Sequence, residues 1–314
     1  MAAGPTGGPD GGARAPVSIV VCSRDRAALL EASLAAIGAV RGSADELVVV
    51  DSASAGDQTA AVARAGGADR VVRCDLPGLS RARNAGLREA RHDVVLFTDD
   101  DCAPDPGWVE GLLAALAEPG AAVATGAVAP VGGGFLSGLT AAEPERQTYP
   151  VRGNPRGHGA SMAFRRADLL AVGGFDEALG AGAPLRAADD WDVFFRLLRQ
   201  GGALVYTPGA VVRHDQWRAT GQALRVRFGY SVGAGALAVK CWRLGRPADR
   251  RQATLVLGGR LGEGARAVAV GVVTLRWFRA LSGALTLAGA LRGAAAALRL
   301  PVEQGRFTSP GSGR

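Results

Sequence analysis

Cysteine is scarce in this 314-residue sequence, and its few positions do not form a motif. There is no C-x-x-C pair among Cys22, Cys74, Cys102 and Cys241. This spacing fits neither a zinc site nor a disulfide framework. A chain without disulfides suits a reducing compartment, so we expect a cytoplasmic location.

Several targeting and nucleotide-binding patterns are also missing. The N-terminus is rich in Gly, Pro and Ala and lacks the basic and then apolar pattern of a signal peptide, so residues 1–15 are predicted to be a disordered tail. No G-x-G-x-x-G follows the first apolar run, and no G-x-x-x-x-G-K-[ST] occurs. These absences argue against a dinucleotide-binding Rossmann domain and a P-loop. No uncharged apolar stretch reaches the 18 or so residues of a membrane-spanning helix.

Acidic residues are rare in the last third of the chain. From Gln216 onward, 16 Arg or Lys residues accompany only three acids, although the whole chain has a net charge of +7. The arginines alternate with Leu, Val, Ala, Trp and Phe, which favours amphipathic helices over a nucleic-acid-binding arm. We expect two or three such helices over residues 217–302, packed on the rest of the chain, on a second subunit in an oligomer, or on the inner face of a membrane as a peripheral contact. Residues 303–314 are predicted to be disordered.

The feature that organises the rest is an apolar run, Val94–Phe97, that leads into Asp99, Asp100 and Asp101. The run predicts a buried parallel strand, and ligands of open α/β sheets bind at the carboxyl ends of such strands. Three adjacent carboxylates repel one another unless a cation joins them, and the Asp-x-Asp pair suits Mg²⁺ or Mn²⁺. Asp105, followed by Pro, is expected to cap the next helix.

Strand-like and helical patterns alternate along the first half of the chain. Short β-rich runs at 17–22, 47–50 and 70–74 are separated by helical periodicity, which predicts a parallel sheet with right-handed crossovers. Further strands are expected at 123–129, 159–164, 204–206 and 211–214, and the Gly/Pro-rich stretch 131–159 is expected to be a functional loop. A helix opening at Gly78 carries Arg81 and Arg83, which could meet a phosphate or form a solvated basic face.

A second acidic cluster comprises Asp189, Asp190 and Asp192, ahead of an apolar helical run. Acids are favourable at a helix N-terminus, but three in four positions exceed what capping needs. A carboxylate beside a substrate hydroxyl could act as a general base. His214 is a structural residue or a ligand, depending on whether these acids gather near it.

The order of these motifs resembles the family 2 glycosyltransferases. The resemblance covers about residues 16–216 and rests on Val17–Arg26, Leu47–Ser54, Gly78–Gly86, Asp99–Asp101, Gly173–Asp176, Asp189–Asp192 and His214. It implies the GT-A fold, an α/β architecture with a Rossmann-like, mostly parallel sheet flanked by helices. The nucleotide-sugar half would occupy residues 16–130 and the acceptor half 131–216, with the C-terminal amphipathic helices as an appendage.

The resemblance also implies roles for individual residues. Asp190 would be the general base, and Asp51 would contact the base or ribose of the nucleotide. The donor site would comprise Ser23, Arg24, Asp25, Asp51, Arg83, Asn84, Asp99 and Asp100. The divalent metal, Mn²⁺ or Mg²⁺, would be held by Asp99, Asp101 and His214. The acceptor side would comprise Asp189, Trp191 and Asp192.

The sequence departs from the family pattern at three places. Cys22–Asp25 stands where Pro-Thr-Tyr-Asn is common, Asp189 replaces a Glu, and Ser161 stands where Asn is frequent. The implied reaction is inverting transfer of a sugar from a nucleoside-diphosphate sugar, with UDP or dTDP expected, to an acceptor hydroxyl.

Three other functions share parts of this pattern. A glycoside hydrolase also uses two carboxylates but needs no Asp-x-Asp metal clamp. A sugar-phosphate nucleotidyltransferase would need an N-terminal Gly-rich basic loop, which is missing. The alternative from a different class is a catalytically silent, membrane-associated scaffold. The pattern gives neither the sugar nor the linkage.

Overall fold

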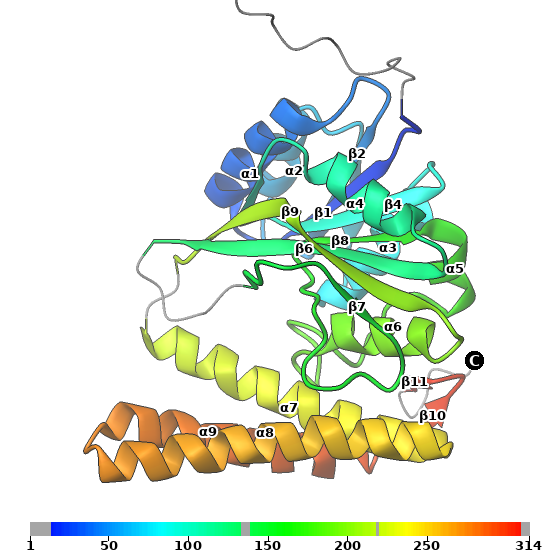
Figure 1. Cartoon of the computed structure of the whole chain (residues 1–314). Helices are drawn as coiled ribbons and strands as arrows, with labels where there is room; N and C mark the ends of the chain where they lie inside the picture. Colours follow the sequence, from blue (N-terminus) through cyan, green and yellow to red (C-terminus); the bar gives the residue numbers. More distant parts are fainter. Residues whose placement is uncertain (1–13, 133–138, 218–219, 309–314) are drawn as a thin grey trace, which may run out of the picture.

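A computed structural model describes residues 14–132, 139–217 and 220–308 of the chain (Figure 1). The main sheet has the strand order β3-β2-β1-β4-β8-β6-β9-β5, and β7 pairs with β9. Its strands are β1 Ser18–Ser23, β2 Glu46–Ser52, β3 Arg70–Cys74, β4 Val94–Asp99, β5 Cys102–Pro104, β6 Ala121–Val131, β7 Glu145–Gln147, β8 Met162–Arg165 and β9 Ala203–Asp215. The helices are α1 Ala27–Val40, α2 Gln58–Ala65, α3 Leu79–Glu89, α4 Trp108–Ala117, α5 Arg166–Ala171, α6 Asp189–Leu198, α7 Thr220–Leu244, α8 Pro247–Val273 and α9 Trp277–Ala297.

The predicted parallel sheet is confirmed for its first half. Strands β3, β2, β1 and β4 run parallel, and β6 runs parallel to β9, whereas β8, β5 and β7 are antiparallel to their neighbours. The register pairs Cys22 with Asp99 and Ser23 with Asp51. The carboxyl ends of β1, β2 and β4 therefore meet at one edge of the sheet, where the sequence places its polar residues.

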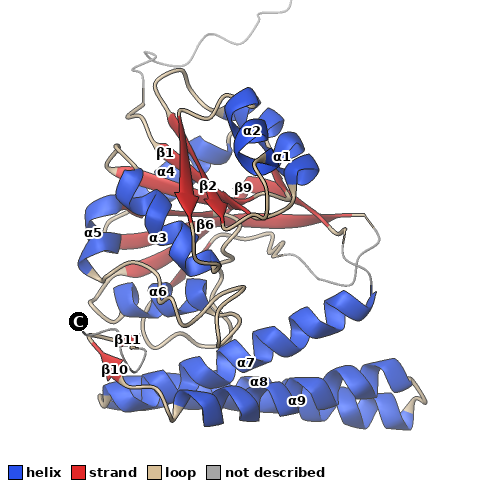
Figure 2. Ribbon diagram, turned by 180° about the vertical axis from the view of Figure 1, so that it is seen from behind, coloured by secondary structure: helices blue, strands red, loops and turns tan. Residues whose placement is uncertain are grey.

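Helices cover both faces of the sheet (Figure 2), and each face has a hydrophobic core beneath them. Alternate residues of β1 and β2 point to opposite faces because strand side chains alternate. One core joins the sheet to α1, α2 and α4, and the other joins it to α3, α5 and α6. This double cover explains why the strands read as continuous apolar runs in the sequence.

Some sequence predictions are wrong at the level of single elements. Asp105 does not cap α4, because Gly107 takes a left-handed φ of 85° and the helix begins at Trp108. The Asp105 carboxylate instead accepts a hydrogen bond of 2.7 Å from Arg213 Nε. The two expected strands after residue 203 are one strand, β9, and the expected loop 131–159 contains the short strand β7.

The C-terminal part forms three long helices, as expected, and they lie below the sheet in Figure 1. Residues 231–241 of α7 are almost entirely buried, so this segment is a core helix and not an interfacial one. Lys240 is the only lysine of the chain and is 1% exposed. Its ammonium lies between Asp176 Oδ2 (2.5 Å) and Asp192 Oδ1 (2.6 Å). These contacts attach α7 to the main α/β unit, in agreement with one of the three expected arrangements.

The predicted disordered tails are wrong where the structure describes the chain. Arg14 forms ion pairs with Asp45 and Glu110. Residues 302–303 and 306–307 form a small antiparallel pair, β10 and β11, and the Phe307 N–H donates to Asp176 Oδ2 at 2.7 Å. The remaining tail residues, 1–13 and 309–314, lie outside the described residues.

Candidate active site

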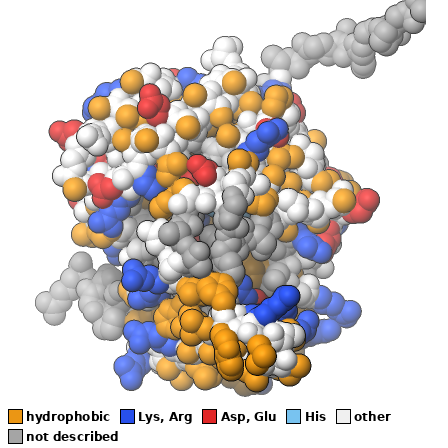
Figure 3. Space-filling view, turned by 90° about the vertical axis from the view of Figure 1, so that its left-hand side faces the viewer, with side chains coloured by type: hydrophobic (Ala, Val, Ile, Leu, Met, Phe, Trp, Pro, Cys, Tyr) orange, Lys and Arg blue, Asp and Glu red, His pale blue; other side chains and the backbone are white. Residues whose placement is uncertain are grey.

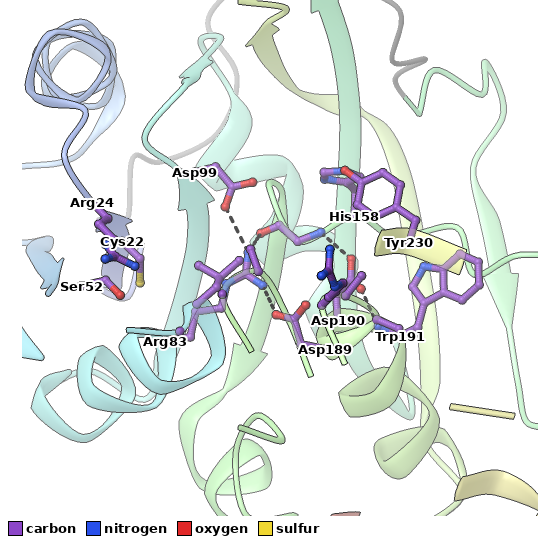
Figure 4. A pocket seen from close by; sticks show the side chains of 18 of the residues that line it. Cys22, Arg24, Ser52, Arg83, Asp99, His158, Asp189, Asp190, Trp191 and Tyr230 are labelled. Carbon is purple, nitrogen blue, oxygen red and sulfur yellow. Dashed lines mark hydrogen bonds and ion pairs between the residues drawn. The ribbon is translucent and has the colours of Figure 1, made fainter. Parts of the chain in front are cut away.

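A pocket of about 430 Å³ lies at the carboxyl ends of β1, β2 and β4. The N-terminus of α6 and the helices α7 and α8 complete its walls (Figure 4). Of the residues predicted for the site, it is lined by Ser23, Arg24, Arg83, Asp99, Asp101, Asp189, Asp190, Trp191 and His214. The structure thus brings together most of the donor, metal and base candidates that lie far apart in the sequence.

The three consecutive acids after β4 have three different environments. Asp99 is partly exposed to the pocket, and its Oδ1 accepts a hydrogen bond of 3.1 Å from Arg83 Nη2. Asp100 is fully buried behind the pocket, with Arg26 Nη2 at 2.7 Å from its Oδ1. Burial raises the pKa of Asp100 to about 7, although the Arg26 charge opposes this rise. Strand β4 ends at Asp99, and Asp100 and Asp101 form the turn that leads into β5; of the three acids, Asp99 and Asp101 line the pocket and Asp100 does not.

The acid that lies beside His214 is Asp101 of the first acidic cluster. His214 Nε2 is 3.3 Å from Asp101 Oδ1, and Trp217 Nε1 donates to Asp101 Oδ2 at 2.9 Å. Burial opposes ionisation, but these contacts hold the pKa of Asp101 well below its usual range.

The side chains of Asp101, His214 and Cys102 could together approach a metal ion. One ligand atom from each of the three lies within 4.8 Å of the others. Burial raises the pKa of the Cys102 thiol, and a hard divalent ion such as Mn²⁺ prefers oxygen and nitrogen donors to sulfur. A carboxylate and an imidazole remain, and this oxygen and nitrogen donor pair suits a divalent ion such as Mn²⁺.

Arg83 connects the two acidic clusters. Its side chain is 4% exposed, and its guanidinium bonds Asp189 Oδ2 at 2.6 Å, Asp99 Oδ1 at 3.1 Å and the Gly159 carbonyl at 3.0 Å. Arg81, by contrast, is at the surface and pairs with Glu177 at 3.0 Å. Arg81 therefore belongs to a surface face, as one of the two interpretations expected, whereas Arg83 lines the pocket and contact of Arg83 with a phosphate stays a prediction.

The three acids of α6 also differ from one another. Asp189 pairs with Arg83, and burial raises the pKa of Asp189 to about 6 although Arg83 opposes the rise. Asp190 lines the pocket, and its two oxygens accept the N–H groups of Gly159 (2.9 Å) and Trp191 (2.8 Å). These bonds fix the orientation of Asp190 and leave lone pairs for a further donor. Asp192 lies instead in the buried contact with Lys240.

Five predicted site residues do not line this pocket. Asp25 accepts the Ala55 N–H, Asn84 bonds both backbone groups of Phe175, and Asp100 and Asp192 are buried. Asp51 faces a neighbouring pocket of about 330 Å³ and is paired with Arg73 at 2.6 Å. The assignment of Asp192 to the acceptor side is thus wrong for this structure, because its carboxylate neutralises Lys240.

Sequence reasoning missed several residues of the pocket, namely Arg26, His158, Arg186, Tyr230 and Arg260. His158 stands between two glycines in the sequence, and this context was a signal that could have pointed to it. In the structure its ring is 6.3 Å from that of His214. Tyr230 and Arg260 come from α7 and α8, where no motif marks them. They reach the pocket only through the packing of these helices.

Comparison with known proteins gives the class of this domain. Among curated relatives, a pre-mycofactocin glycosyltransferase from Mycobacterium tuberculosis is 31% identical over 193 residues, covering 59% of this chain and 38% of the relative. A glucosyl-dolichyl phosphate glucuronosyltransferase from Haloferax volcanii is 30% identical over 165 residues, covering 46% and 51% of the two chains. The chain therefore spans only about a third to a half of the length of these relatives.

Solved structures share the fold over most of the chain. The mannosyltransferase PcManGT from Pyrobaculum calidifontis, solved with GDP-Man and Mn²⁺, has a TM-score of 0.62 at 20% identity and covers 91% of this chain and 88% of its own. TarS residues 1–349 from S. aureus have a TM-score of 0.51 at 14% identity, with coverage of 94% and 97%. The fold is thus that of the GT-A glycosyltransferases.

The family follows from the sequence itself. Residues 18–169 match the family described as glycosyl transferase family 2. The chain therefore carries a family 2 glycosyltransferase domain, and the resemblance found in the sequence is confirmed.

Proposed function

We propose that this chain transfers a sugar from a nucleoside-diphosphate sugar to an acceptor hydroxyl, with inversion at the anomeric carbon. The observation that carries the proposal is the arrangement of one pocket. Asp101 and His214 lie on one side, Asp190 lies at the N-terminus of α6, and Arg83 lies between the two acidic groups.

The donor diphosphate would bind at the ends of β1 and β4. Asp101 and His214, with Asp99 alongside, would hold a divalent metal there, and that metal would supply Lewis acidity to the leaving diphosphate. Arg24 and Arg26 also line this part of the pocket and add positive charge. The nucleotides to compare are UDP and dTDP, which the sequence analysis expects, and GDP, because the mannosyltransferase neighbour was solved with GDP-Man.

The acceptor would bind between α6 and the C-terminal helices. Asp190 would take the proton of the acceptor hydroxyl while the acceptor oxygen bonds to the anomeric carbon and the bond to the diphosphate oxygen breaks. A single displacement of this kind inverts the anomeric centre. Trp191, Tyr230 and Arg260 line the same part of the pocket and would contact the acceptor. A cytoplasmic location stays a prediction.

A matched set of variants tests the proposal. We expect a thermal shift with one nucleoside diphosphate that depends on Mn²⁺ and is lost in Asp101→Asn, because a ligand stabilises the state that binds it. Asp190→Asn should keep that shift but lower release of the nucleoside diphosphate from its sugar by about 10²–10⁴-fold.

The control is Asp105→Asn, since Asp105 is a surface acid paired with Arg213 outside the pocket. It should match the wild type in both assays. If Asp190→Asn retained full turnover, the assignment of the base would be wrong. If no nucleotide shifted the wild type, the silent scaffold would be the better function.

A further inference from the structure

The connection between α8 and α9 carries a cluster of exposed apolar side chains. Val273 is 84% exposed, Leu275 72% and Trp277 66%. Val272, Phe278 and Leu281 are also exposed. We call these six residues the hairpin tip. In Figure 3 an orange patch lies at the foot of the molecule, on the side to which the α8–α9 connection points in Figure 1.

Around the hairpin tip the charge has one sign. From Gly264 to Val302 the sequence has five arginines and no Asp or Glu. Arg266, Arg276 and Arg279 are nearest to the tip, and none of them forms an ion pair with a carboxylate of a described residue. Exposed apolar residues beside unneutralised arginines complement an anionic, amphipathic surface.

We propose that the hairpin tip docks on an anionic lipid bilayer. Val273, Leu275 and Trp277 would enter the headgroup region, where Trp is favoured because its ring is apolar and its N–H is polar. Arg276 and Arg279 would contact lipid phosphates. Each arginine near an anionic surface strengthens partitioning by about fivefold.

The tip is held rigidly by small residues where α8 meets α9. A Cβ added to Gly271 would lie 2.4 Å from the Ala280 nitrogen, and one added to Gly264 would lie 2.8 Å from Leu287 Cγ. The two helices therefore approach too closely for larger side chains. A rigid tip needs little further ordering when it binds, which favours binding.

The tip is proposed to insert shallowly and not to span the bilayer. Helix α9 is long and apolar enough to cross a membrane, although the sequence analysis found no uncharged run of that length. Yet α9 buries Gly289 and Gly293 against α7, where a Cβ on Gly293 would lie 1.9 Å from the Val232 carbonyl oxygen. Spanning would break this packing, whereas docking of the tip keeps it.

Docking of the tip has a consequence for the pocket. Arg260, which lines the pocket, precedes Val273 by 13 residues on the same helix, or roughly 20 Å along the helix axis. The wall that α8 contributes to the pocket would thus be held close to the bilayer surface. The docking itself does not depend on the proposed glycosyl transfer.

The test is co-sedimentation of the full chain with vesicles. We would compare phosphatidylcholine alone with phosphatidylcholine containing about one-third phosphatidylglycerol, where the negative surface potential attracts arginine. The wild type should bind the anionic vesicles, and binding should weaken as salt rises. Val273→Glu with Leu275→Glu should lower the partition coefficient about tenfold or more, and Arg276→Gln with Arg279→Gln should lower it by about 25-fold.

The control is Leu76→Glu, which adds one negative charge, half the change of the double variant, at an exposed leucine on the α/β unit. It should bind as the wild type does. Equal binding of the double-glutamate variant and the wild type would overturn the proposal, as would no binding of the wild type to anionic vesicles. Light scattering tests the alternative of self-association. If the wild type were a dimer that did not bind vesicles, and the double-glutamate variant were a monomer, the tip would be a dimer interface instead.

Discussion

Replacing Lys240 by methionine should destabilise the protein strongly. The ammonium of Lys240 is the shared partner of Asp176 and Asp192, and all three side chains are nearly inaccessible. Removing it leaves a buried carboxylate without compensation, which costs about 3–5 kcal/mol. With roughly 2.1 cal/mol/K of unfolding entropy per residue, this cost lowers Tm by about 5–8 °C for a chain of this length.

The structure also predicts a partial rescue. Asp192 keeps a second partner in the variant, because Arg196 Nε donates to its Oδ2 at 2.9 Å. Among the described residues, Asp176 keeps only two backbone donors, the N–H groups of Phe307 and Ala178. Lys240→Met combined with Asp176→Asn should therefore recover at least about 1–2 kcal/mol, since neutralising the stranded carboxylate removes much of the penalty.

Two assays read this prediction. Urea unfolding gives the free energies. The control is Arg88→Met, expected within about 0.5 kcal/mol of the wild type, because Arg88 is exposed and its side chain forms no ion pair with the described residues. Because Lys240 is the one lysine of the chain, acylation of its side-chain amine followed by mass spectrometry reports its accessibility directly. The reasoning fails if Lys240→Met unfolds within about 1 kcal/mol of the wild type, or if Lys240 is acylated rapidly in the folded protein.

Two further variants address α8 and the pocket. Burial would raise the pKa of Asp249, but hydrogen bonds from Arg199 and Tyr149 outweigh burial and lower this pKa. The ionised carboxylate therefore stabilises the folded protein above the unfolded pKa of about 3.9, and this stabilisation is lost as the pH falls through the folded pKa. Asp249→Asn should thus cost about 2 kcal/mol at pH 7, with a smaller difference in urea melts near pH 3. Gly159→Ala would place a Cβ 2.6 Å from Arg83 Nη2 and should lower donor turnover by about 100-fold, as a displacement of about 1 Å can do. Gly209→Ala, with no atom within 4 Å of its added Cβ, is the matched control, and equal activity of the two variants would contradict the role of Arg83.

The sequence was most informative where a local pattern determines a position. The apolar run into Asp99–Asp101 predicted both the strand and the pocket edge, because a buried parallel strand leaves little choice for its polar end. Asp190 was singled out by a different signal, the acid cluster ahead of a helical run, and the resemblance to the family pointed to His214; both residues line the pocket. Capping at Asp105 failed because a glycine in the left-handed region can start a helix without a side-chain cap.

Other pocket residues could be identified only from tertiary packing, because no local sequence pattern marks them. Arg81 and Arg83 are two positions apart on one helix, so they point to different sides, but only the fold shows which side is the pocket. Tyr230 and Arg260 reach that pocket because α7 and α8 pack below the sheet (Figure 1), where Lys240 of α7 binds Asp192 of α6. Their sequence context is ordinary amphipathic helix, and no motif distinguishes them from surface residues.

The three acids of α6 show both what a sequence pattern predicts and what only the folded structure reveals. Their clustering indicated chemistry, but the structure divides them among three tasks: Asp189 binds Arg83, Asp190 faces the pocket, and Asp192 binds Lys240. Because Asp192 follows Asp190 by two residues on one rigid turn, the contact with Lys240 also fixes where Asp190 points. The C-terminal helices therefore support the proposed base through α6, in addition to lining the pocket themselves.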